Sequence, residues 1–450
     1  MNVTVDRHPL ATLLDRNRWT AVMFLKRVSD RHRAREGSAT ATRKEKVSRW
    51  TSGSITPEIT VQEAMADVLG VDPQEVRRRG WPDWLFLAFD DDHTILESPW
   101  TPAGTVQALE SVGGPVDRRG FLVASSGALA AMVAQWATAP HSAATSTSGR
   151  RIGQQVVTLF DTRLDALRHL DDQVGSGQAY DAATAELRLI TRILREASYS
   201  DNTGRSLYTL AAEASQLAGW CAYDSGHTAT AERHFITAVR ASASSGNDTA
   251  GASALAFWAN LRYTNGDPRG ALDLINGALA STRNITSPRV LAMLHARQAR
   301  AHSKAGETAA AYRAVDAALD AYDRAGPASE DLPAMYWVTA GELHQVAASS
   351  ALSLGEPHRA LRHFDAAMSH HDPYDTEKEA RGTAIYLARR AEAHLALGDI
   401  DAALESAHQV LEHMSGVDSA LSSSTLTELR DQLRTHRHIR AVQDFLGLTA

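Results

Sequence analysis

The chain has 450 residues, of which 44% are hydrophobic and 22% charged, enough for two or three domains with sizeable apolar cores. Its single cysteine, Cys221, excludes an internal disulfide bond and suits a reducing, cytoplasmic setting. The net charge of −7 is uneven: residues 1–80 hold 15 Lys and Arg against 10 Asp and Glu, which leaves +5 there and −12 elsewhere. A basic end on an acidic body fits a nucleic-acid-binding head attached to a second module.

Residues 1–80 are predicted to form a compact helical domain. A bend rich in small and polar residues, Gly37–Thr42, leads into the basic helix RKEKVSRW, which Gly53 ends. Around it, apolar residues recur at helical spacing in three further segments. These segments are Pro9–Arg16, Trp19–Arg33 and Ile59–Leu69.

The segment from Lys46 to Val71 resembles the closing half of a helix-turn-helix domain of the Cro/phage-repressor type. Val47 and Trp50, three residues apart, would form the buried face of a recognition helix near residues 43–51. Gly53 would supply the left-handed residue after that helix. Side chains that point away from the buried face would then enter the major groove of double-stranded DNA: Arg43, Lys44, Glu45, Ser48 and Arg49.

The residue types near this helix suggest different roles at DNA. Arg43, Lys44 and Arg49 could reach guanine acceptors or phosphates, and Glu45 could accept a hydrogen bond from a cytosine amino group. Lys46 is expected to contact the DNA backbone instead, together with three arginines of the preceding helix. The alternative is a solvated basic helix with no DNA partner. Those three arginines are Arg27, Arg31 and Arg33.

Residues 81–150 are predicted to connect two domains. The part from 81 to 115 is rich in Trp, Pro, Asp and Gly, lacks clear periodicity, and is expected to dock through its tryptophans. A helix is expected over 117–138. Its start carries twin arginines, Arg118 and Arg119, before an apolar segment, which is the pattern of a twin-arginine export signal. Because the pattern follows an apparently folded domain, we interpret it as an apolar helix that packs on its neighbours.

No signal peptide and no apolar run of about 20 residues is visible, so no membrane association is expected.

The region 151–450 contains five glycines at intervals of 40, 40, 49 and 43 residues. Each is preceded at seven residues by a small residue, and a small–bulky–small set follows at five, nine and twelve residues. Such self-similarity predicts stacked helix pairs, in which small residues allow close approach of the two helices. The set resembles the tetratricopeptide (TPR) signature, although these periods exceed 34 residues. The glycines are Gly226, Gly266, Gly306, Gly355 and Gly398.

Three segments depart from this regular pattern. The longest interval, between Gly306 and Gly355, contains GPASEDLP and is expected to hold a loop that interrupts the stack. The segment Gly177–Leu194 looks like a degenerate first repeat, and Leu426–Leu448 like a capping helix.

In stacked repeats the first helix of each pair lines the concave side, where a groove for a peptide, a small-molecule effector or a partner is expected. Amide groups there could satisfy a peptide backbone, and arginine its carboxylate. Alternatively, these residues are solvated or pack against another subunit. The predicted groove residues are Trp220, Tyr223, Asn260, Tyr263, Arg300, Lys304 and Gln345, and further residues expected to face the groove are Glu213, Gln216, Asp224, Thr264, Ser303, Glu342, Ser349 and Glu392.

Motifs for catalysis are missing from the sequence. It contains no GK[ST] phosphate loop, no HExxH motif and no Cys/His cluster, so we expect neither an enzyme nor a cofactor or metal. The runs Asp90–His93 and His370–Asp372 are interpreted as loops, and Cys221 as a packed thiol.

Taken in order, LATLLDRNRWT, VSRWTSG, WPDWL, PWTPAG and VDRRGFL, followed by the repeats, are similar to actinobacterial helix-turn-helix/repeat regulators of the NsdA type. The resemblance implies an all-α, homodimeric transcriptional regulator, such as a repressor, of differentiation or secondary metabolism. The chain has Thr40-Ala41-Thr42 where that family usually shows an acidic Tyr-Asp pair, so a DNA sequence preference is not implied. The alternative is a repeat scaffold that binds a partner protein and not DNA.

Overall fold

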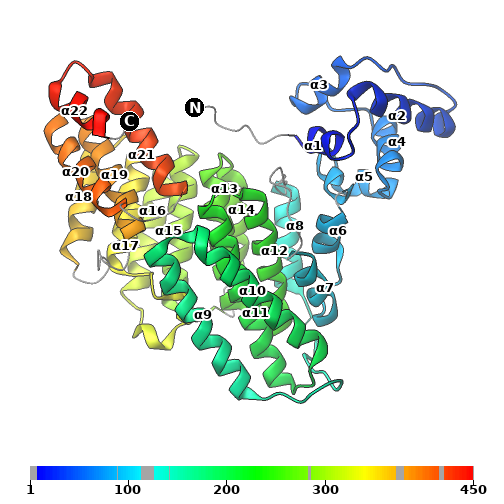
Figure 1. Cartoon of the computed structure of the whole chain (residues 1–450), viewed down its shortest axis with the longest axis horizontal. Coiled ribbons are helices and arrows are strands. Elements are labelled where there is room, and N and C mark those ends of the chain that lie inside the picture. The colour runs from blue at the N-terminus through cyan, green and yellow to red at the C-terminus, as the bar shows by residue number, and fades with distance from the viewer. Residues whose placement is uncertain are drawn as a thin grey trace.

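The computed structural model describes residues 8–88, 90–112, 126–140, 142–281, 285–370, 380–414 and 420–448. Over these residues the fold is all-helical, with twenty-two α-helices, four short 3-10 helices and two isolated β-bridges. Figure 1 shows a small helical head at the N-terminal end and a larger stack of helices that continues to the C-terminus. None of the helices in the described ranges combines the length and apolar character needed to cross a bilayer.

The head consists of five short helices and one 3-10 helix around a single apolar core. Fully buried side chains from separate elements meet there, among them Leu13, Phe24, Met65 and Trp84. The elements are α1 Pro9–Arg16, α2 Ala21–Glu36, α3 Glu45–Thr51, α4 Ile59–Leu69, α5 Pro73–Arg79 and η1 Asp83–Ala88. The indole Nε1 of Trp84 donates a hydrogen bond to Gln62 Oε1 at 3.0 Å. This large side chain therefore fills part of the core and also links η1 to α4.

Two helix starts in the head differ from the expected ones. Helix α2 begins after Thr20, whose Oγ1 accepts a hydrogen bond from the backbone N–H of Met23 at 3.2 Å, and ends at Gly37, which has a φ of 72°. It therefore covers 21–36 and not 19–33. Helix α3 begins at Glu45, so Arg43 precedes it and Lys44 is its N-cap residue.

The connecting region 81–150 contains more regular structure than expected. After η1 come three α-helices, the first two of which are too short, at 8 and 11 residues, to show a clear apolar period. Within 81–115, the tryptophans expected to dock include Trp84, which is buried in the head, and Trp100, whose ring centroid lies 4.6 Å from the guanidinium carbon of Arg240. Trp136 belongs to the helix expected over 117–138, and its Nε1 donates to Ser242 Oγ at 3.0 Å, so this helix packs on the stack. The predicted twin-arginine motif lies outside the described residues. The three helices are α6 Asp90–Glu97, α7 Pro102–Val112 and α8 Ser126–Thr138.

The remaining helices pack as consecutive pairs (Figure 1). Several begin with proline at the first turn, where its missing N–H costs no helical hydrogen bond. The expected capping helix is divided between the end of α21, a 3-10 turn and α22. The elements are α9 Gln154–Val174, α10 Ser176–Glu196, α11 Asp201–Asp224, α12 Thr228–Ser245, α13 Asp248–Thr264, α14 Pro268–Ala280, α15 Pro288–Lys304, α16 Thr308–Tyr322, η2 Ala328–Glu330, η3 Pro333–Met335, α17 Ala340–Ser353, α18 Pro357–Ser369, α19 Ala380–Ala396, α20 Ile400–Met414, α21 Ala420–Leu433, η4 Arg434–His436 and α22 Arg440–Leu448.

The five recurring glycines each lie in the turn between two paired helices, as predicted. Their φ angles of 74° to 85° are in the left-handed region, which glycine enters without steric cost. The small residue seven positions earlier has a packing reason: a Cβ on Gly219 would lie 2.8 Å from Cε1 of Phe235. Thus glycine sets the turn, and small residues set the separation of the helices.

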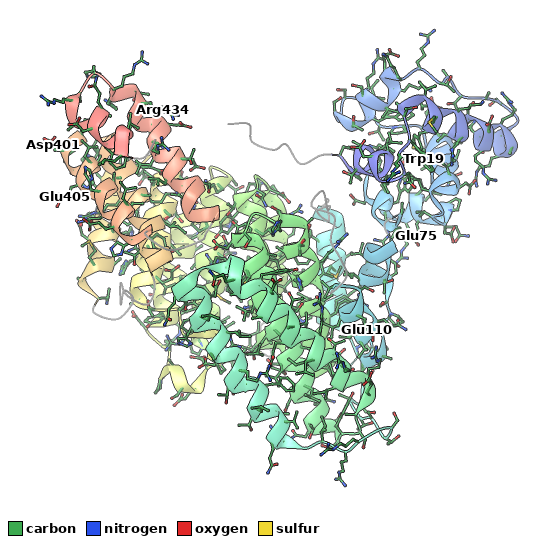
Figure 2. All side chains as sticks on the ribbon, viewed as in Figure 1. Trp19, Glu75, Glu110, Asp401, Glu405 and Arg434 are labelled. Atoms are coloured by element: carbon green, nitrogen blue, oxygen red, sulfur yellow. The ribbon has the colours of Figure 1, made fainter. Side chains whose placement is uncertain are left out.

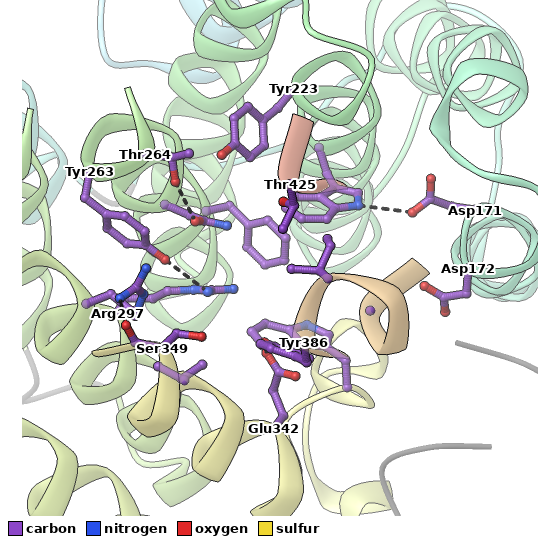
Figure 3. Close-up of a pocket in the computed structure, with 18 of the residues that line it drawn as sticks. Asp171, Asp172, Tyr223, Tyr263, Thr264, Arg297, Glu342, Ser349, Tyr386 and Thr425 are labelled. Carbon is purple, nitrogen blue, oxygen red and sulfur yellow. Dashed lines mark hydrogen bonds between the residues drawn. The ribbon is translucent and has the colours of Figure 1, made fainter. Parts of the chain in front are cut away.

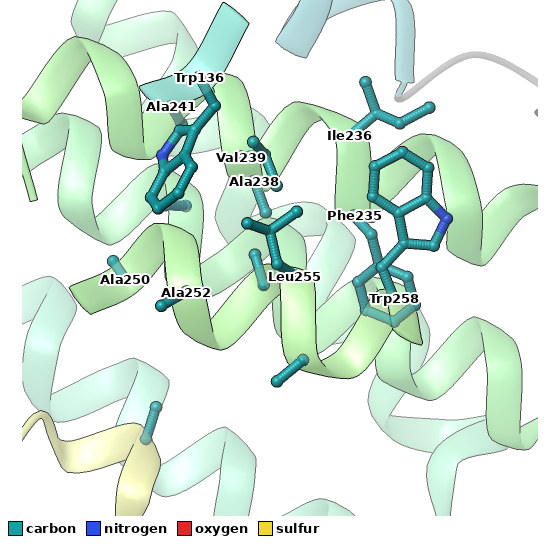
Figure 4. Packing of buried hydrophobic residues seen from close by; sticks show 14 of the residues in the cluster. Trp136, Phe235, Ile236, Ala238, Val239, Ala241, Ala250, Ala252, Leu255 and Trp258 are labelled. Carbon is teal, nitrogen blue, oxygen red and sulfur yellow. The ribbon is translucent and has the colours of Figure 1, made fainter. Parts of the chain in front are cut away.

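Figure 4 shows how the small–bulky–small set fills the seam between neighbouring helices. Phe235 and Ala238 of α12 and Leu255 and Trp258 of α13 are all fully buried in one cluster. Because of this close fit, truncation of a bulky seam residue should lower the stability of the stack, since the space left behind cannot collapse completely.

Candidate functional site

Helix α3 divides its side chains between the core and the surface as the sequence predicted. Val47 and Trp50 are buried, at 7% and 4% exposure. The ammonium of Lys46 lies 5.8 Å from the centroid of the Trp50 ring, and the Lys46 side chain is only partly exposed. The other predicted DNA contacts are exposed: Arg43, Lys44, Glu45, Ser48 and Arg49.

In the part of the chain that the structure describes, the cations in and next to α3 have no ionic partner, in contrast to Arg35, Arg77, Arg78 and Arg79 of the same head. Among the described residues, Arg43, Lys44 and Arg49 have no carboxylate within 4.0 Å. By contrast, Arg35 lies 3.1 Å from both Glu63 and Asp67. The positive charge near α3 is therefore free to act on a partner.

The paired cations lie at another side of the head. Arg78 and Arg79 each contact Glu75 at 2.9 Å. Burial raises the pKa of Glu75, but hydrogen bonds from the two arginines outweigh it and leave the pKa below its usual value. Glu75 lies where the head continues toward α6 (Figure 2), whereas α3 lies at the far side of the head (Figure 1).

A second site lies in the stack, where helices α9, α11, α13, α15, α17, α19 and α21 surround a cavity of about 320 Å³. The odd-numbered, first helices of the pairs thus line the concave side, as predicted. Figure 3 shows Asp171 and Asp172 on one side of the cavity and Tyr263 and Arg297 on the opposite side.

The structure brings together six of the seven groove residues that the sequence singled out: Trp220, Tyr223, Asn260, Tyr263, Arg300 and Lys304 line the cavity. Five of the additional expected residues, Glu213, Gln216, Thr264, Glu342 and Ser349, line it as well. Asp224 and Ser303 do not line it, contrary to the expectation, because both are buried between helices.

Gln345 does not line the cavity, contrary to the expectation. Helix α17 presents Glu342, Val346 and Ser349 to it, at a spacing of four and then three residues, which is one helix face. Gln345 lies on the adjacent face and is 5% exposed. Glu392, another expected residue, is also buried outside the cavity, and it pairs with Arg389 at 2.8 Å.

The long interval between Gly306 and Gly355 contains the interruption expected there, and it contributes directly to the cavity. Residues 323–339 form turns and the short helices η2 and η3. Arg289 anchors this segment by donating to the carbonyl oxygens of Gly326 at 2.8 Å and Val338 at 2.7 Å. At its end, the hydroxyl of Tyr336 donates to Asp172, 164 residues away in the chain.

Aromatic rings form one wall of the cavity. Trp220 meets Phe257 edge to face at a centroid distance of 5.5 Å, and Phe257 meets Trp337 in the same way at 5.7 Å. The indole Nε1 of Trp220 donates to Asp171 at 3.1 Å, which fixes the orientation of its ring. The wall is therefore aromatic, its rings alternate in orientation, and the hydrogen bond of Trp220 holds one end of it in place.

Some of the charged groups that line the cavity are paired or hydrogen-bonded within the protein. Arg168 and Glu213 form a buried ion pair. Arg389 lies 3.3 Å from Glu428, and Glu342 accepts a hydrogen bond from the hydroxyl of Tyr386 at 2.5 Å.

Sequence reasoning missed several lining residues. Arg297 could have been found, since it lies three residues before Arg300 on the same helix face. Tyr386 and Arg389 occupy the corresponding face of a later repeat. Trp337 belongs to the irregular segment, for which a periodic pattern gives no orientation.

The described residues contain no group of three or more His, Cys, Asp or Glu side chains arranged to hold a metal. Cys221 is fully buried, and its thiol donates to Asp171 Oδ1 at 3.6 Å, in line with a packed thiol. The run Asp90–His93 forms the start of helix α6, contrary to the expectation of a loop. Its side chains, and His371 and Asp372, lie outside what the structure describes.

A comparison with protein families finds no family that matches the sequence, and a comparison with curated proteins finds no match.

Proposed function

We propose that this protein is a cytoplasmic DNA-binding transcriptional regulator in which the region around α3 enters the major groove. The observation that carries the proposal is the row of exposed, unpaired cations beside the buried Val47 and Trp50. A short helix whose apolar face is anchored and whose opposite face is basic has the form needed to approach base edges. Arg49 and Lys44 would read or position DNA, and Glu45 would accept from a cytosine amino group.

Helix α2 supports the proposal with further unpaired cations. Arg31 and Arg33 are exposed, and Arg27 stacks on Trp19, with its guanidinium carbon 4.4 Å from the ring centroid. These groups would contact phosphates and set the register of the head on DNA. Their contribution would be independent of base sequence and sensitive to salt.

A single short recognition helix gives limited affinity, so we propose that the protein binds as a homodimer to an inverted repeat. The helical stack would dimerise, and its cavity would hold an effector that changes DNA affinity. The order of segments in the sequence, a basic helical head followed by repeats, resembles that of actinobacterial helix-turn-helix/repeat regulators of the NsdA type. Control of differentiation or secondary metabolism, such as repression, is the corresponding role.

Selection from a random 30-base-pair DNA library with the full-length protein tests the proposal. We expect enrichment of an inverted repeat and an affinity that falls steeply between 50 and 200 mM salt. Lys44→Ala combined with Arg49→Ala should weaken binding to the enriched DNA by about 100-fold, since each base contact contributes on the order of 1–3 kcal/mol. Fluorescence anisotropy measures both effects.

The matched control is Arg313→Ala with Arg324→Ala, which removes two exposed arginines that lie on or next to α16, outside the head. It should leave the affinity unchanged. Specific binding that survives in the α3 double variant would remove the groove assignment. If no sequence is enriched at all, the protein is better explained as a scaffold whose repeats bind a partner protein.

A further inference from the structure

Helix α15 places three cations on one face toward the cavity without giving them an ionic partner. Arg297, Arg300 and Lys304 are spaced by three and then four residues, which puts them on one side of the helix. Among the described residues, none of the three has a carboxylate within 4.0 Å. This part of the cavity therefore carries a local excess of positive charge.

The two guanidinium groups are held in place and still have donors to spare. Arg300 Nη1 donates to the carbonyl oxygen of Ser349 at 2.7 Å and to Ser353 Oγ at 3.1 Å. Arg297 Nη1 donates to the hydroxyl of Tyr263 at 3.2 Å, while its buried Nε has no hydrogen-bond partner. Fixed donors that lack an acceptor are prepared for an anion, because little conformational entropy remains to be lost on binding.

The electrostatic surroundings differ among the three cations. Burial opposes the charge of Arg297, but Tyr263 and the charge of Glu342 outweigh it and leave the pKa of Arg297 raised. Burial lowers the pKa of Arg300, and the charges of Arg389 and Arg297 lower it further. Partial burial and the charge of Arg300 likewise lower the pKa of Lys304. A bound anion would relieve this repulsion.

The aromatic wall begins next to these cations. Arg297 lies over Trp337, with its guanidinium carbon 5.1 Å from the ring centroid, and Trp337 continues into Phe257 and Trp220. A ligand whose anionic group contacts the arginines would thus place the rest of its structure against aromatic rings.

We propose that the cavity binds a small organic monocarboxylate with an aromatic or apolar body. The carboxylate contacts Arg297 and Arg300, with Lys304 at the rim, and the body packs on Trp337 and Phe257. The role of this ligand as an effector rests on the proposed function. Binding of the ligand to the cavity does not, because it requires no DNA.

Charge and size distinguish this class from two others. A phosphate dianion is disfavoured because Glu342 and Glu428 also line the cavity. An extended peptide is disfavoured because about 320 Å³ is at the small end of sites that hold one small molecule. The cavity is also bounded by Trp337 and by Thr425 of α21.

Calorimetric titration of the full-length protein without DNA tests the proposal, using indole-3-acetate, 3-phenylpropionate and naphthalene-2-carboxylate as probes. Their primary amides serve as neutral counterparts. At least one acid should bind ten or more times as tightly as its amide and quench tryptophan fluorescence. In Arg300→Gln, the affinity for the acid should fall to within about twofold of the affinity for the amide. Arg313→Gln, on the exposed face of α16, is the matched control and should retain the preference.

Because buried arginines can matter for folding, Lys304→Gln provides a second variant at an exposed position. It should weaken acid binding about threefold while leaving the circular dichroism spectrum unchanged. The proposal is overturned if no acid binds below about 1 mM, if acids and amides bind equally, or if Arg300→Gln keeps the preference. If phenyl phosphate, or an acetylated tripeptide acid ending in tryptophan, binds more tightly than the monocarboxylates, the ligand belongs to that class and not to the proposed one. None of these results bears on whether the head binds DNA.

Discussion

Helix α3 and helix α15 both display cations without ionic partners, but in opposite surroundings. On α3, Arg43, Lys44 and Arg49 face solvent on the outside of the head. On α15, Arg297 is 9% exposed and faces an enclosed space beside aromatic rings. An exposed row can follow a long polyanion whose charges repeat along its length, whereas an enclosed pair accommodates one anion of limited size.

The two regions also have separate apolar cores, and the same substitution in each provides the largest test of the comparison. Phe24→Ala in the head and Phe235→Ala in the stack each remove a fully buried phenyl ring. Each should cost about 3–5 kcal/mol of unfolding free energy in its own region. Hydrogen exchange followed by mass spectrometry should show faster exchange in 8–88 for the first and in 201–264 for the second. Faster exchange in both regions from either variant would mean that the cores are one cooperative unit.

A smaller effect is expected when cations with and without an ion pair on a single helix are compared in DNA binding. In α2, Arg31 is exposed without an ion pair, whereas Arg35 contacts Glu63 and Asp67. Arg31→Gln should weaken DNA binding to all sequences and reduce the slope of log affinity against log salt by about 0.9, the value for one phosphate contact. Arg35→Gln should leave that slope unchanged. Equal slopes for the two variants would show that pairing does not decide which cations meet DNA.

The last prediction concerns pH and a histidine of the stack. Complete burial, with smaller contributions from the charges of Arg233 and Arg188, lowers the pKa of His234 to about 3. Because the unfolded chain binds this proton near pH 6.5, stability is fully present above that pH and is lost as the pH falls toward 3. One such proton changes the unfolding free energy by about 1.4 kcal/mol per pH unit.

Urea unfolding of the stack between pH 7 and pH 5 measures this dependence. His234→Asn should flatten it by about one proton, whereas His227→Asn removes an exposed histidine and tests whether any such replacement acts alike. An unchanged dependence in His234→Asn would show that other groups produce the acid sensitivity.

The comparison also explains which features the sequence could predict. Val47 and Trp50 could be assigned to the core because a helix repeats every 3.6 residues, and the glycines marked pair boundaries because a left-handed turn favours glycine. The same period placed Trp220, Asn260 and Arg300 around one cavity. The prediction for Gln345 was wrong because this residue lies about 60° round the helix from Glu342, at the side of the face that α17 presents to the cavity.

Other features depend on contacts that no local pattern records. Tyr336 and Trp337 lie in an irregular segment, whose direction is set by the hydrogen bonds of Arg289 and by packing on Phe257. The ion pairs of Arg35 join positions 28 and 32 residues apart, so exposure alone could not distinguish it from Arg31. Sequence thus indicates which residues share a helix face, and tertiary packing decides which charges remain free.

The hydrogen bond from Tyr336 to Asp172 has a consequence for how the stack folds and unfolds. In a simple solenoid each repeat contacts its neighbours alone, so folding can spread along the chain and either end can fray independently. Here a contact across 164 residues, together with contact between α9 and α19, ties the first pair to distant repeats. Such high contact order slows folding and suppresses independent fraying at the N-terminal end of the stack. The array therefore behaves as a closed loop and not as an open chain.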